Sequence, residues 1–138
     1  MPIHFFYESA EKPKIKINNS KSWIKKIIES HGKKTGNINY IFCSDEYLLK
    51  INKDFLSHNY YTDIITFNNC EGNIISGDIF ISLDRVKENA KKYDSHDSEV
   101  YRVMVHGVLH LIGFKDGSDA EQEDMRHQEN EALKQIKN

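Results

Sequence analysis

The chain has 138 residues, with 19 Lys and Arg against 21 Asp and Glu and a formal net charge of −2. At 38% hydrophobic and 29% charged residues, the composition is typical of a soluble globular protein and excludes a disordered chain. The near-neutral charge also excludes a protein that coats nucleic acid through bulk positive charge.

No segment of the sequence indicates export or insertion into a membrane. The N-terminus lacks the basic and apolar regions of a signal peptide, and no uncharged run approaches the roughly 18 residues of a membrane span. Cys43 and Cys70 stand far apart and are too few for a disulfide framework. We therefore expect a cytoplasmic protein without a membrane partner. Because no repeat or linker divides the chain, we expect a single domain over residues 1–138.

The first half of the chain predicts two strands, each followed by a helix. The expected elements are a strand at 3–7, a helix at 20–31, a strand at 38–43 and a helix from 45 through 55. Gly32 is expected to end the first helix, and Ser44 is the expected N-cap of the second. The apolar side chains of the second helix, Phe55 among them, are expected to be buried.

The second half predicts a hairpin and then three helices. The expected elements are strands at 63–67 and 77–83 joined by a turn at 71–73, a polar helix at 85–93, and a longer helix capped by Asp97 or Ser98 that ends near Ile112. Ser118 and Glu121 form a capping box that opens the last helix. Since the elements do not repeat as βαβ units, we expect an α+β fold with a small mixed sheet of about four strands packed with about five helices.

The helix that ends near Ile112 has a broad apolar surface, so we expect it to be central and mostly buried. It carries His106 and His110, whose spacing of four residues places both imidazoles on one face, as two ligands of one metal ion require. Two buried histidines with other hydrogen-bond partners are the alternative interpretation. Gly107 is costly inside a helix and indicates a close approach by another backbone or by a substrate.

A turn at Gly113 would reverse the chain and bring Asp116 back beside the two imidazoles. Two nitrogens, one carboxylate oxygen and an open fourth position form the arrangement of a catalytic zinc site. A zinc ion held there would lower the pKa of its bound water toward neutrality. Asp63 and Asp78 begin strands and either face this site or serve as turn and strand-cap carboxylates.

Three segments together resemble a known family. The sequence HGVLHLIGFKD at 106–116 resembles the signature H-G-x-L-H-L-x-G-Y-D-H of YbeY, a family of bacterial rRNA-maturation endoribonucleases. The segment TDIITF at 62–67 resembles P-T-D-V-L-S-F of that family, and GDIFIS at 77–82 resembles G-D-I-x-I-S. The resemblance extends from about residue 38 to residue 125.

The resemblance implies a zinc-dependent endoribonuclease, specific for single strands, that acts in 16S rRNA 3′-end maturation and ribosome quality control. The implied partners are rRNA and the small ribosomal subunit or its associated factors. One zinc ion per chain would be held by His106, His110 and Asp116, and its bound water would carry the chemistry without a separate general base. Hydrolysis by that water and attack by a ribose 2′-hydroxyl remain alternative mechanisms.

Two positions depart from the family pattern. Asp116 stands where the family has its third histidine, and Leu56 stands where its Y-R-G-K-D segment has an arginine. His58 is the expected substitute contact for an RNA phosphate. Residues 1–36 hold eight lysines against three glutamates, so Lys21 and Lys25 are expected on an RNA-facing surface.

Two other functions fit parts of the pattern. The spacing of the histidines also resembles that of metzincin-like zinc peptidases, but Gly107 occupies the position of their general base and has no side chain to accept a proton. A non-catalytic, ribosome-associated zinc-binding factor is the third interpretation. The open coordination position favours an enzyme over that third interpretation.

Overall fold

The computed structural model describes residues 3–8, 13, 15–92 and 98–136. Its elements are β1 (Ile3–Glu8), α1 (Ile17–Ser30), β2 (Lys34–Cys43), α2 (Asp45–Leu56), β3 (Ile64–Asn68), β4 (Ile74–Ser82), α3 (Leu83–Lys92), α4 (Glu99–Ile112) and α5 (Asp119–Leu133). The expected α+β fold is confirmed, with four strands and five helices among the described residues. The predicted cap at Asp97 and the predicted helix end at Tyr93 lie outside those residues.

The four strands form one mixed sheet in the order β1-β2-β4-β3. β1 pairs with β2 and β2 pairs with β4 in parallel, whereas β3 and β4 form the predicted antiparallel hairpin. Gly72 takes a positive φ of 57° in the turn between them, a conformation in which glycine carries no steric penalty. β2 begins at Lys34, earlier than predicted, because its polar first residues pair with the start of β4.

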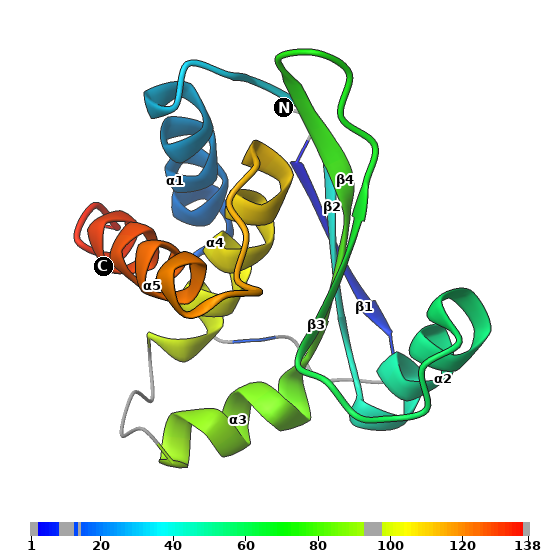
Figure 1. Cartoon of the computed structure of the whole chain (residues 1–138). Coiled ribbons are helices and arrows are strands. Elements are labelled where there is room, and N and C mark those ends of the chain that lie inside the picture. Colours follow the sequence, from blue (N-terminus) through cyan, green and yellow to red (C-terminus); the bar gives the residue numbers. More distant parts are fainter. Residues whose placement is uncertain (1–2, 9–12, 14, 93–97, 137–138) are drawn as a thin grey trace.

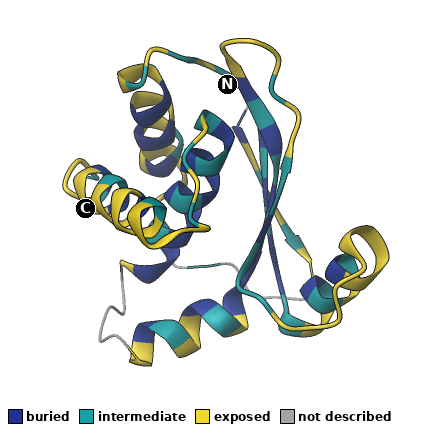
Figure 2. Cartoon of the chain, viewed as in Figure 1, coloured by how far each residue is buried: buried dark blue, intermediate teal, exposed yellow. Residues whose placement is uncertain are grey.

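Helices cover the two faces of the sheet unequally. Figure 1 shows α1, α4 and α5 on one side of the sheet and α2 on the other. The main core lies between the sheet and the first group of helices, and α4 passes through it as the predominantly buried helix that the sequence predicts (Figure 2). A second, smaller core lies under α2 and consists of Cys43, Leu48 and Ile65.

Gly107 lets α4 lie directly on the sheet. A Cβ atom at this position would stand 2.9 Å from Cγ2 of Ile79 and 3.1 Å from Cδ1 of Ile64. Both distances are shorter than ordinary van der Waals contact, so a larger residue would push α4 away from β3 and β4. The close approach at Gly107 is therefore made by side chains of the sheet, and not by another backbone or a substrate as the sequence predicts.

The exposure of Phe55 and the start of α1 also differ from the sequence predictions. Phe55 is 67% exposed, and the last part of α2 lies at the surface, away from the sheet (Figure 2). Its ring forms a T-shaped pair with the Phe67 ring, with centroids 6.1 Å apart. α1 begins at Ile17 rather than at Ser20, since the Ser20 hydroxyl bonds to the carbonyl of Lys16 inside the first turn.

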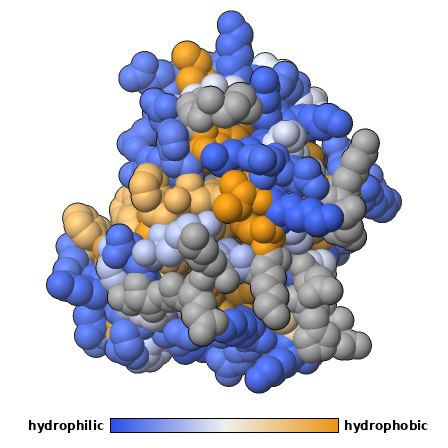
Figure 3. Space-filling model, turned by 180° about the vertical axis from the view of Figure 1, so that it is seen from behind, coloured by the Kyte–Doolittle hydropathy of each residue, from blue (hydrophilic) through white to orange (hydrophobic). Residues whose placement is uncertain are grey.

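The surface is mostly hydrophilic. On the face shown in Figure 3, hydrophobic side chains gather in a band across the middle and hydrophilic ones surround it. Isolated exposed apolar side chains such as Phe6 and Ile17 are usual on a folded domain. None of the helices in the described residues combines the length and the apolar character needed to cross a membrane.

Candidate metal centre

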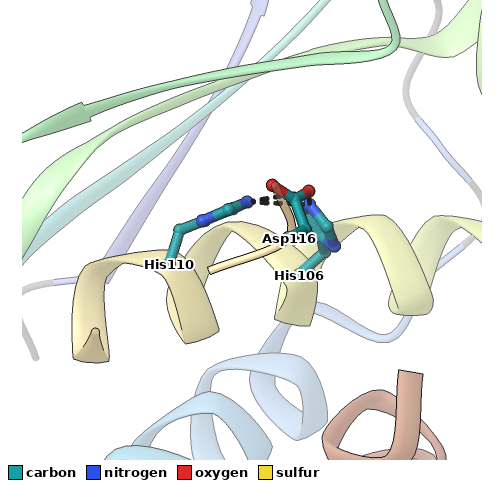
Figure 4. A group of neighbouring side chains, drawn as sticks. All are labelled: His106, His110 and Asp116. Atoms are coloured by element: carbon teal, nitrogen blue, oxygen red, sulfur yellow. Dashed lines mark hydrogen bonds and ion pairs between the residues drawn. The ribbon is translucent and has the colours of Figure 1, made fainter. Parts of the chain in front are cut away.

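Three side chains from one short stretch of chain meet beside α4. His106 and His110 lie one turn apart, with their Nε2 atoms separated by 3.0 Å. α4 ends where Gly113 takes a φ of 127° and donates its N–H to the carbonyl of Leu109. The chain then reverses and places Oδ2 of Asp116 3.3 Å from Nε2 of each histidine. Figure 4 shows the three side chains pointing toward one another on the side of α4 that faces the sheet.

The spacing of these three atoms fits one zinc ion. In a tetrahedral site with bonds of about 2.0 Å to nitrogen or oxygen, neighbouring ligand atoms lie about 3.3 Å apart. The measured separations are 3.0, 3.3 and 3.3 Å, so the donors already form one face of such a tetrahedron. His106, His110 and Asp116 could therefore hold a metal ion and leave a position open for substrate or water.

Glu129 of α5 fixes the orientation of one imidazole. Nδ1 of His106 donates to Oε2 of Glu129 across 2.7 Å, which leaves the lone pair of Nε2 directed at the metal position. Glu129 is only 5% exposed, and Nη1 of Arg102 donates to its other oxygen across 2.8 Å. A carboxylate that accepts from the second nitrogen of a histidine is typical of metal-binding histidines.

The charges of Glu129, His106 and Arg102 shift the pKa values of Glu129 and His106. Burial raises the pKa of Glu129, but the hydrogen bonds from His106 and Arg102 outweigh it, and the net pKa is lowered. Burial lowers the pKa of His106, yet the bond to Glu129 and the charges of Glu129 and Asp116 raise it above the ordinary value of 6.5. Nearby, burial raises the pKa of Asp63 despite the opposing effect of His106.

Three cavities adjoin His106. One of about 680 Å³ lies against the first turns of α5, and two others lie along α4. Of the two along α4, one has a volume of about 310 Å³ and includes Asp63, Arg102 and Arg126 in its lining. The other has a volume of about 640 Å³ and lies between α4 and β3, where Asp63 also contributes to its wall. Asp78 lines none of these three cavities and accepts a hydrogen bond from Asn39 instead.

The residues expected to contact RNA lie apart from the histidine pair. His58 is exposed and stacks on Tyr60, while the Nζ atom of Lys21 lies 5.7 Å from the centre of the Phe5 ring. Lys25 is exposed, and its Nζ atom lies 4.0 Å from Oε1 of Glu29. His58, Lys21 and Lys25 are absent from the walls of the three cavities that adjoin His106.

Glu129 and Arg102 were not predicted from the sequence. Arg102 precedes His106 by one helical turn, and Glu129 belongs to the stripe of α5 that turns toward the core. That stripe also contains Met125 and Ala132, so the three buried residues follow the i, i+4, i+7 spacing of an inward face. A carboxylate on this otherwise apolar stripe was the signal that could have identified Glu129 as a functional residue.

Comparisons with known proteins identify relatives over nearly the whole length of the chain. The model of the family described as endoribonuclease YbeY matches residues 6–137. A protein named endoribonuclease YbeY from Parabacteroides distasonis is 49% identical over 134 residues, covering 96% of this chain and 94% of that protein. One of the same name from Christiangramia forsetii is 52% identical over 114 residues, covering 82% of this chain and 80% of that protein.

The fold is also similar to a solved structure. The solution structure of TM1509 from Thermotoga maritima superimposes with a TM-score of 0.70 at 22% identity, and the match covers 96% of this chain and 88% of that one. At that identity the likeness establishes a shared fold. Together with the family match over nearly the whole length, the comparisons show that the chain belongs to the endoribonuclease YbeY family.

Proposed function

We propose that this protein is a zinc-dependent endoribonuclease that cleaves single-stranded RNA in the cytoplasm. In this proposal residues 1–138 form one catalytic domain with one zinc ion, and the enzyme acts with the small ribosomal subunit in 16S rRNA 3′-end maturation and ribosome quality control. The observation that carries the proposal is the triangle of His106, His110 and Asp116 beside α4. Membership of the endoribonuclease YbeY family supports RNA as the substrate.

The side chains around the site have separate tasks in this reaction. His106, His110 and Asp116 hold the ion, and Glu129 keeps the proton of His106 on Nδ1. Arg102 keeps Glu129 ionised and in place. When bound, zinc supplies a Lewis acid that polarises a phosphoryl oxygen and makes a proton of water easier to remove.

The two cavities along α4 suit a nucleic-acid strand that passes the histidine pair. Arg126 lines the smaller cavity with an exposed guanidinium group, which is a suitable contact for an RNA phosphate. The arginine of the family pattern is replaced by Leu56, which has no such group, so Arg126 is the proposed phosphate contact beside the site. His58 is the proposed RNA contact on the connection between α2 and β3.

The packing of Gly107 disfavours the peptidase alternative. A zinc peptidase of the metzincin type needs a glutamate at this position as its general base. Here the position faces Ile64 and Ile79 so closely that even a Cβ atom lacks ordinary room. A glutamate side chain therefore has no place there, and a nuclease remains the function that the geometry supports best.

The test is incubation of purified, zinc-loaded protein with single-stranded RNA and, separately, with casein. We expect RNA cleavage that stops with a chelator, returns with zinc and is lost in His106→Ala and His110→Ala. The chemistry of the new RNA ends distinguishes hydrolysis from attack by the 2′-hydroxyl, because only the latter leaves a cyclic phosphate. Cleavage of casein alone would contradict the proposal, and zinc binding without any cleavage would favour a non-catalytic factor.

A further inference from the structure

The connection between α2 and β3 carries two exposed aromatic rings that stack on each other. The rings of His58 and Tyr60 have centroids 5.1 Å apart and planes inclined by 21°. The Tyr60 hydroxyl lies 3.0 Å from Nδ1 of His58, so a hydrogen bond also joins the pair. Tyr60 nevertheless remains 56% exposed. A large part of its ring is therefore available to another flat molecule.

A buried side chain anchors this pair. Asn52 of α2 is 1% exposed, and its Nδ2 atom donates to the carbonyl of Tyr60 across 2.9 Å. The backbone carbonyl of Asn52 accepts from the N–H of His58 across 3.1 Å. Because these bonds involve the main chain of the connection, the ring pair is held in place before any ligand arrives. Such preorganisation lowers the entropic cost of binding.

Tyr60 also belongs to the wall of the metal centre. It lines the cavity of about 640 Å³ whose lining also includes His106, His110 and Asp116. The residues that line this cavity include hydroxyl, amide and carboxyl groups but neither lysine nor arginine. Away from the two histidines, a phosphate group therefore meets no cationic side chain, whereas a neutral base or ribose meets suitable hydrogen-bonding groups.

We propose that His58 and Tyr60 form a stacking platform for one base of single-stranded RNA, next to the phosphate that lies at the metal centre. This inference rests on the proposed function and adds a binding subsite to it. A base inside a duplex is already stacked on both faces, so the platform accepts only an unpaired base. It therefore contributes to a preference for single strands without reading a particular base.

The test measures the affinity of the zinc-loaded protein for a 2′-O-methylated hexanucleotide, by fluorescence anisotropy, with mass spectrometry to verify that the probe stays intact. We expect Tyr60→Ala to weaken binding by between about 5-fold and about 150-fold, the range found for loss of one base–aromatic stack. Tyr60→Trp should preserve the affinity because it keeps a broad ring. The anchoring bonds of Asn52 reach only main-chain atoms of the connection, so these substitutions leave them in place.

Tyr61→Ala is the matched control. Tyr61 is an exposed neighbour, but its hydroxyl donates to Glu46 across 2.7 Å and the guanidinium of Arg85 lies 5.0 Å from its ring centre. It is absent from the cavity wall, so we expect its loss to leave RNA affinity unchanged. An equal loss of affinity in Tyr60→Ala and Tyr61→Ala would contradict a specific platform.

Probes that lack one base locate the contact. Removal of the base that rests on Tyr60 should weaken binding to the wild type by the same factor as Tyr60→Ala, and should have no further effect on that variant. The platform is overturned if every abasic probe loses as much affinity for Tyr60→Ala as it loses for the wild type. It is also overturned if Tyr60→Ala binds the intact probe with wild-type affinity. A wild-type protein that binds no single-stranded RNA overturns the proposed function itself, which is a distinct result.

Discussion

At the scale of single residues, Glu129 determines how His106 presents its nitrogen to a metal. Both oxygens of this buried carboxylate are in use, one by His106 and the other by Arg102. Removal of its charge would leave Arg102 without its buried counter-ion and weaken the bond to Nδ1 of His106. The residue therefore acts through His106 rather than on the substrate.

We predict that Glu129→Gln weakens zinc binding by about 10- to 100-fold, the usual effect of losing a carboxylate that orients a histidine ligand. Competition with a chromophoric chelator measures the dissociation constant. Glu131→Gln is the control, because Glu131 lies on the same helix and only forms an exposed ion pair with Lys134. Equal zinc affinity in Glu129→Gln and the wild type would contradict this role.

Asp116 is the second residue whose loss has a defined consequence. We expect Asp116→Ala to reduce zinc affinity, since one of three close donors disappears. Metal analysis after dialysis and a chelator titration give stoichiometry and affinity. His127→Ala serves as the control, because His127 is an exposed residue of α5. Unchanged zinc binding in Asp116→Ala would exclude Asp116 from the ligands.

At the scale of elements, one hydrogen bond ties α4 to the middle of the sheet. The hydroxyl of Tyr40, a fully buried residue of β2, donates to the carbonyl of Met104 across 2.9 Å. Burial raises the pKa of Tyr40 well above its ordinary value of 10.0. The folded protein therefore keeps the phenol protonated at a pH at which the unfolded chain has lost that proton.

This bond predicts a stability difference that depends on pH. Tyr40→Phe should lower the free energy of unfolding by about 1 kcal/mol at neutral pH. The contribution of the phenol is complete below about pH 10 and falls as pH rises further, because only the unfolded chain then releases the proton. Urea denaturation of both proteins across this range should show the difference shrinking, and a difference independent of pH would contradict the prediction.

The elements also show which features a sequence can reveal. Periodicity and caps predict the strands, the burial of α4 and the capping box at Ser118, because each depends on residues close together in the chain. The donors at 106–116 could be predicted for the same reason. The exposure of Phe55 and the roles of Arg102 and Glu129 could not, because they depend on where α2 and α5 lie relative to the rest of the fold.

At the scale of the whole molecule, a lysine-rich helix packs against an acidic one. The indole N–H of Trp23 in α1 donates across 2.8 Å to the carbonyl of Ala132, in the last turn of the acidic helix α5. Figure 1 shows the two helices side by side. Positive and negative surfaces are therefore adjacent although the total charge is only −2.

We predict that Lys21→Ala and Lys25→Ala each weaken RNA binding at low salt. If each lysine contacts one phosphate, its loss also reduces the slope of log affinity against log salt by about 0.7, the value for a single-stranded nucleic acid. Binding measured at several salt concentrations gives the slope. Lys134→Ala, directly after α5, should leave the slope unchanged, and unchanged slopes in the Lys21 and Lys25 variants would remove α1 from the RNA surface.

The shared core predicts that the chain unfolds as one unit. Its main cluster includes Ile3 from the first strand and Ala132 from the last helix, so the two ends of the fold depend on the same packing. We expect thermal unfolding followed by circular dichroism to coincide with that followed by the fluorescence of Trp23, the single tryptophan. Two separate transitions would contradict the proposal of one domain over residues 1–138.

The turn at Gly113 has a consequence for how zinc stabilises the fold. Since His106, His110 and Asp116 lie within a short stretch of chain, little loop-closure entropy is lost when they gather around an ion before the sheet forms. If zinc is the bound ion, we therefore expect the denatured ensemble to retain some affinity for it. A ligand that binds the unfolded chain as well as the folded one raises the melting temperature by less than its affinity for the folded protein alone would give. Added zinc should therefore increase thermal stability by less than its dissociation constant for the folded protein predicts.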